Sequence, residues 1–148
     1  IRVKAFNHLL GSCGVTLFGA PPLATAFNGK FPACLDGAPF LLPAEGSTLR
    51  RSLEQWLESR NIRPRVVGEF KDSALMNTFG QAGAGFFPAP SAIEREIHEN
   101  HKADAVGRLD SLIERFYAIS VERKLKHPAV VAISEAARDK LFAPSPGR

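Results

Sequence analysis

The sequence has few of the features that mark specialised protein classes. Only two cysteines, Cys13 and Cys34, occur in 148 residues, and they lie in apolar surroundings without a CxxC or framework spacing. We therefore expect buried free thiols in a reducing compartment rather than a disulfide. No apolar run approaches the roughly 18 residues of a membrane helix, and no signal-peptide pattern opens the chain. These absences favour a cytoplasmic protein that has no contact with a membrane.

Charge of one sign is not concentrated along the chain. The net charge is +4 and the pI about 9.4, but the 19 basic residues are scattered. The densest group, Arg123, Lys124, Lys126 and His127, lacks interleaved aromatic residues and is typical of a solvated turn, so we expect no nucleic-acid contact by this chain. The hydrophobic share of 45% indicates a globular protein with one sizeable core, or one domain and part of another. Because the chain begins at Ile1 in a β-like run, we expect an internal fragment.

Motifs for catalysis are also scarce. Residues 80–85 read GxxGxG, which reverses the dinucleotide-binding fingerprint and follows a helix instead of opening one. His98 and His101 have a metal-like spacing but no third ligand nearby. No serine or cysteine lies in a nucleophile elbow. The sequence therefore predicts no enzyme, no metal site and no cofactor.

The most informative stretch covers residues 66–90. Val66, Val67 and Phe70 favour a strand, and Asp72 is a good N-cap for a helix that begins at Ser73. Glycines end this helix before a second apolar strand that stops at Pro88. A strand, a helix and another strand form a βαβ unit, whose strands are parallel.

Similar patterns predict the remaining elements. Strands are expected at residues 1–6, 13–18, 40–42, 63–70, 106–109 and 115–122, with turns at residues 8–12 and 101–104. Helices are expected after an N-cap at Ser47 as far as Arg60, at residues 92–98, and from Pro128 to about Leu141.

Parallel strands bring the loops at residues 43–47, 69–73 and 88–91 to one edge, where ligands bind in open α/β sheets. Helix N-termini in the first two loops favour an anion, whereas Glu45, Glu69 and Asp72 add negative charge to the same edge. A carboxylate beside Lys71 and a hydrated cation both remain possible, as does the plain alternative that these polar residues only cap helices. The candidate donors are Ser47, Thr48, Lys71 and Ser73, the candidate acceptors Glu69 and Asp72, and the apolar wall Phe70.

Four segments carry a family resemblance: FPACLDGAPFLLP at 31–43, LRRSLEQWLES at 49–59, VVGEFKDSALMNTFGQAG at 66–83 and FYAISVERKLKHPAVVAI at 116–133. On these, the chain resembles the C-terminal effector-binding (substrate-binding) domain of LysR-type transcriptional regulators, and within them the sodium-responsive NhaR branch. The resemblance implies an α/β fold of the type 2 periplasmic-binding-protein kind, with one complete Rossmann-like lobe and part of a second. It assigns residues 1–19 to a remnant of the first lobe and the outgoing crossover strand, residues 20–112 to the second lobe, and residues 113–148 to the return crossover strand and the C-terminal helix of the first lobe.

The resemblance also implies a function. The chain is expected to sense a small-molecule or ion effector and to control sodium/proton antiporter genes. The resemblance further implies that the full-length protein forms dimers or tetramers and that it binds DNA only through an N-terminal domain that this chain is expected to lack. The alternative is a stand-alone solute-binding module of the same fold, which an export signal upstream would favour and a helix-turn-helix upstream would not.

Overall fold

The computed structural model describes residues 4–101, 103–121, 131–132 and 135. The chain divides into two compact units, one made of Ile1–Cys13 with Ile113–Arg148 and the other of Gly14–Leu112. The long strands β1 (Phe6–Gly19) and β5 (Asp104–Ser120) each contribute residues to both units. The candidate site lies in the second unit.

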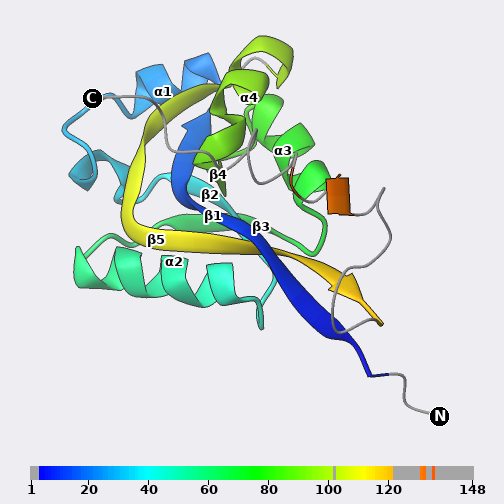
Figure 1. Cartoon of the computed structure of the whole chain (residues 1–148). Helices are drawn as coiled ribbons and strands as arrows, with labels where there is room; N and C mark the ends of the chain where they lie inside the picture. The colour runs from blue at the N-terminus through cyan, green and yellow to red at the C-terminus, as the bar shows by residue number, and fades with distance from the viewer. Residues whose placement is uncertain (1–3, 102, 122–130, 133–134, 136–148) are drawn as a thin grey trace, which may run out of the picture. The chain divides into compact units, whose positions relative to one another are not determined.

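The strands of the second unit form two hydrogen-bonded groups joined by one bridge (Figure 1). Strand β2 (Pro39–Pro43) runs parallel to β3 (Arg65–Phe70), and β4 (Phe87–Pro90) runs antiparallel to β1, which is followed by β5. A parallel bridge between Phe40 and Phe86 connects β2 to the residue just before β4. The predicted parallel pairing is thus confirmed for β2 and β3, and the single bridge at Phe86 is parallel as well.

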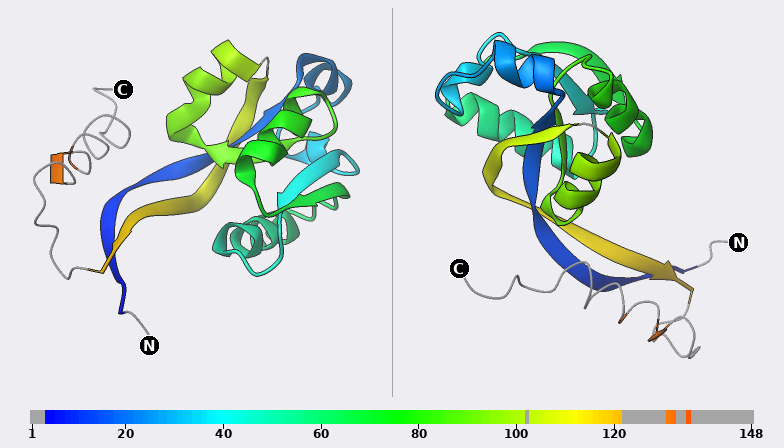
Figure 2. Two further views of the ribbon diagram at one scale, coloured as in Figure 1. Left: turned by 90° about the vertical axis from the view of Figure 1, so that its right-hand side faces the viewer. Right: turned by 90° about the horizontal axis from the view of Figure 1, so that it is seen from above.

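Helices cover both faces of these strands, as the views in Figure 2 show. The helices are α1 (Pro21–Ala26), α2 (Thr48–Ser59), α3 (Ser73–Gln81) and α4 (Glu94–His101), with 3-10 turns η1 (Ala33–Leu35) and η2 (Ser91–Ile93). Side chains of α2 pack with Phe40 and Leu42 in one core cluster, while Met76 of α3 packs with Leu41 in another. Successive residues of β2 therefore point to opposite faces, as a strand buried on both sides requires. None of the helices in the described ranges is long and apolar enough to cross a membrane.

Both predicted N-caps are confirmed. Ser47 Oγ accepts a hydrogen bond from the Arg50 backbone N–H at 3.1 Å, and α2 begins at the next residue. Asp72 Oδ1 accepts one from the Ala74 N–H at 2.8 Å, and α3 begins at Ser73. Each cap satisfies a donor that the helix itself leaves unpaired, so the starts of both helices are determined locally.

Two predicted breaks are wrong, because both terminal strands are continuous. The turn expected at residues 8–12 lies inside β1, and the gap expected between residues 109 and 115 lies inside β5. Hydrogen bonding between β1 and β5 outweighs the turn preference of Gly11 and Ser12. Within β5, Ser111 adopts a φ of +74°, a local distortion that does not end the strand.

The helix expected at residues 92–98 also has different bounds, since α4 continues to His101 after a 3-10 turn and takes up the start of the turn expected at residues 101–104. The basic turn at residues 123–127 lies outside the described residues, as does most of the helix expected after Pro128.

Candidate functional site

The carboxyl ends of β2 and β3 meet at one edge, as the parallel pairing requires. The Ala44 N–H donates to the Phe70 carbonyl oxygen at 2.8 Å, which ties the loop after β2 to the end of β3. This bond brings the loops that precede α2 and α3 together, and with them the candidate residues Ser47, Thr48, Glu69, Phe70, Lys71, Asp72 and Ser73. The third loop, at residues 88–91, engages β1, because Ser91 Oγ lies 2.6 Å from Thr16 Oγ1.

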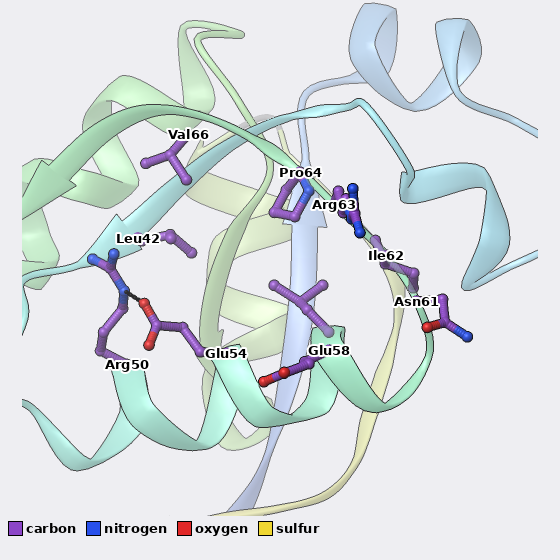
Figure 3. Close-up of a pocket in the computed structure, with 10 residues that line it drawn as sticks. Leu42, Arg50, Glu54, Glu58, Asn61, Ile62, Arg63, Pro64 and Val66 are labelled. Carbon is purple, nitrogen blue, oxygen red and sulfur yellow. Dashed lines mark hydrogen bonds and ion pairs between the residues drawn. The ribbon is translucent and has the colours of Figure 1, made fainter.

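A buried arginine that the sequence analysis did not single out organises this edge. Arg50, in the first turn of α2, is only 7% exposed. Its Nε donates to Glu54 at 2.6 Å, its Nη1 to the Pro43 carbonyl at 2.9 Å and its Nη2 to Glu69 at 3.2 Å. The bond to Glu54 is visible in Figure 3. One guanidinium therefore connects α2, the end of β2 and the end of β3.

The contact between Arg50 and Glu69 depends on an irregularity in β3. The register shifts by one residue between Phe40 and Leu41, so Val67 has no partner on β2. Side chains alternate along a regular strand, which would place Val66 and Glu69 on opposite faces. The extra residue returns Glu69 to the face of α2, where Val66 and Arg50 line the same pocket.

These contacts keep Arg50 charged. Burial alone lowers the pKa of its guanidinium, but the hydrogen bonds and charges of Glu54 and Glu69 raise that pKa above its ordinary value overall. Glu45 Oε1 lies 4.0 Å from Arg50 Nη2, and the Glu45 side chain is mostly exposed. Its electrostatic interaction with Arg50 is therefore weak.

The two candidate acceptors are thus already engaged, Glu69 by Arg50 and Asp72 by the cap of α3. The ring centroids of Phe70 and Phe79 lie 5.4 Å apart, so Phe70 packs against α3. The candidate donors Thr48, Lys71 and Ser73 are all exposed. At this edge the two helix N-termini and Lys71 favour an anion, whereas the exposed Glu45 opposes one.

Of the two histidines considered for a metal, the structure describes the side chain of His98. His98 Nδ1 lies 2.7 Å from Asp104 Oδ1, which occupies one ring nitrogen. In the described ranges, no three His, Cys, Asp or Glu side chains are grouped so that they could hold a metal ion.

Comparison with known proteins adds evidence on ancestry. The family model of the LysR substrate binding domain matches residues 21–142. The chain is 33% identical over 140 residues to the transcriptional activator protein NhaR of Escherichia coli (strain K12) and, equally, to that of Shigella flexneri. These matches cover 95% of this chain but 46% of each NhaR protein, so the chain spans about half the length of the curated relatives it matches.

Solved structures agree in fold. The AmpR effector binding domain from Citrobacter freundii superposes with a TM-score of 0.68 at 19% identity, over 95% of this chain and 70% of that one. The regulatory domain of HypT from Salmonella typhimurium gives 0.65 at 15% identity, over 93% and 66%. These likenesses support the expected α/β fold of the type 2 periplasmic-binding-protein kind. The chain belongs to the LysR substrate binding domain family, a family of transcriptional regulators.

Proposed function

We propose that this chain senses the effector of a LysR-type regulator at the edge formed by residues 47–48 and 69–73. The observation that carries the proposal is the pairing at this edge, where Glu69 forms an ion pair with Arg50 and Asp72 caps α3. Two helix N-termini and the exposed Lys71 then remain as the groups that attract a ligand. The effector accordingly carries a carboxylate or a similar anionic group.

The proposal includes a link to sodium/proton antiporter expression, which rests on the resemblance to the NhaR branch; the 33% identity to NhaR supports it. A sodium ion at this edge would have to draw Glu69 away from Arg50 and would face two positive helix ends. A cation site at Glu69 and Asp72 is therefore the second candidate, and the same experiment distinguishes it from the first.

The proposal includes the division of the chain into lobes that the resemblance implies. Residues 20–112 form the complete second lobe, while residues 1–19 and 113–148 supply the crossover strands and part of the first lobe. The solved effector domains support this assignment, since the chain covers 66% and 70% of their lengths.

The wider activity is that of a cytoplasmic, non-enzymatic regulator that binds DNA through an N-terminal domain. Self-association as a dimer or tetramer is supported by exposed apolar side chains on β3 and α3, namely Val67, Leu75 and Phe79. Effector binding would change the relative orientation of the lobes and therefore the spacing of the DNA-binding subunits. Membership of a regulator family favours this activity over a stand-alone solute-binding module.

Calorimetric titration of the full-length protein with a panel of small carboxylates tests the proposal. We expect saturable binding of at least one carboxylate, weakened tenfold or more by Lys71→Gln and unchanged by Lys30→Gln. Lys30 is an equally exposed lysine between α1 and η1, which makes it a matched control. Equal loss in both variants, or no carboxylate binding at all, would contradict an anion site at this edge.

A further inference from the structure

The second unit contains a pocket that the proposed effector site does not use. It has a volume of about 520 Å³ and lies between α2 and the strands β2 and β3 (Figure 3). Its lining is Leu42, Arg50, Glu54, Leu57, Glu58, Asn61, Ile62, Arg63, Pro64 and Val66. This volume falls within the range of small-molecule sites, and none of residues 70–73 contributes to the wall.

The middle of the pocket is apolar. Leu42, Leu57 and Ile62 are buried members of the core, so their positions are held by packing on the side away from the pocket. Val66, on the edge strand β3, is 45% exposed and contributes apolar surface to the pocket. A ligand with an apolar body would remove this surface from water.

The charges on the rim are of both signs, and two of them have no ion-pair partner among the described residues. Glu54 is bound by Arg50 at 2.6 Å. Glu58, on α2, and Arg63, on the segment that leads into β3, face the same cavity but form no ion pair with each other or with a third described residue. The backbone of Arg63 is fixed, since its N–H donates to Asp36 Oδ1 at 2.8 Å.

From this arrangement we propose that the pocket binds a small zwitterion with an apolar side chain, of the kind represented by an apolar α-amino acid. The ligand ammonium pairs with Glu58, its carboxylate pairs with Arg63, and its side chain covers Leu57, Ile62 and Val66. A cation alone would leave Arg63 unpaired, and an anion alone would leave Glu58 unpaired, so the zwitterion matches both walls.

The pocket also has a physical connection to the proposed effector site. Arg50 forms one end of the pocket in Figure 3 and at the same time binds Glu69 at the end of β3. A ligand that contacts Arg50 therefore acts on a side chain shared by both sites. The binding proposal itself does not depend on the proposed effector site, because it rests on different residues.

Calorimetric titration of the full-length protein with L-leucine and L-phenylalanine, compared with N-acetyl-L-leucine and L-leucinamide, tests the proposal. The last two ligands each lack one of the two charges. We expect saturable binding of the zwitterions and at least tenfold weaker binding of both derivatives. Glu58→Gln and Arg63→Gln should each weaken L-leucine at least tenfold, and in addition Glu58→Gln should abolish the preference for L-leucine over N-acetyl-L-leucine.

Glu96→Gln on α4 and Arg51→Gln on α2 are matched controls, because both side chains are exposed and neither lines the pocket. We expect them to leave the affinity unchanged, and far-UV circular dichroism checks the fold of every variant. The proposal is overturned if no zwitterion binds, if the derivatives bind as well as L-leucine, or if both pocket variants bind normally. Binding that Lys71→Gln abolishes instead would assign the ligand to the effector edge and would also overturn it.

Discussion

Replacement of Arg50 with methionine tests the interaction that joins α2 to the ends of β2 and β3. Methionine keeps much of the aliphatic stem but removes three hydrogen bonds, to Glu54, Glu69 and the Pro43 carbonyl. The two carboxylates are 54% and 49% exposed, so water replaces most of what they lose, and each pair contributes only about 0.5 kcal/mol. The Pro43 carbonyl loses its donor at a cost of about 1 kcal/mol. We therefore expect a loss of about 2 kcal/mol in the free energy of unfolding.

Urea unfolding of the 148-residue chain measures this loss as a lower midpoint with an unchanged slope. Arg51→Met, at the exposed neighbouring position, is the control and should change the free energy by less than about 0.5 kcal/mol. In the Arg50→Met background, Glu69→Gln should have little further effect, because its partner is already gone. A variant as stable as the parent, or more stable, would show that the desolvation of Arg50 outweighs its pairing and would refute this reasoning.

Three further predictions concern single positions. Asp72→Ala should lower the free energy of unfolding by about 1 kcal/mol through loss of the hydrogen bond to the Ala74 N–H, and an unchanged melting midpoint would reject the cap. Gly80→Ala should cost about 1–3 kcal/mol in urea unfolding, because an added Cβ meets the fully buried ring of Phe87; a neutral effect would mean that the ring can move. Burial raises the pKa of Glu114 above its ordinary value, so the folded state binds its proton more tightly than the unfolded state and stability falls as pH rises from the unfolded pKa through the folded pKa. Glu114→Gln should remove that part of the pH dependence and raise the melting midpoint at pH 7, whereas an identical pH profile would contradict the shift.

Local chemistry made several parts of the structure predictable. The caps at Ser47 and Asp72 act on N–H groups two or three residues away, so the sequence alone determines where α2 and α3 begin. The parallel strands and the shared edge also followed from the alternation of strand and helix, and Ala44 and Phe70 are hydrogen-bonded there as that arrangement requires.

Long-range pairing explains what the sequence did not reveal. Gly11 and Ser12 are turn formers, yet β1 continues through them because β5 pairs with it from about 100 residues further along the chain. Arg50 lies at helical spacing from Leu53 and Leu57, which was a usable signal for burial. Glu69 contacts Arg50 only because the register shifts at Val67, and no local sequence pattern predicts that shift.

The most direct test of the central claim, that this edge accepts an anionic effector, is a calorimetric titration of the full-length protein with sodium, lithium and potassium salts, and with the carboxylate that binds it best. The titration is repeated with Glu69→Gln and Asp72→Asn. We expect no saturable binding of the cations. Carboxylate binding should persist in both variants, because the donors Ser47, Thr48, Lys71 and Ser73 remain. Saturable sodium or lithium binding that both substitutions abolish would contradict the claim and would place a cation site at Glu69 and Asp72.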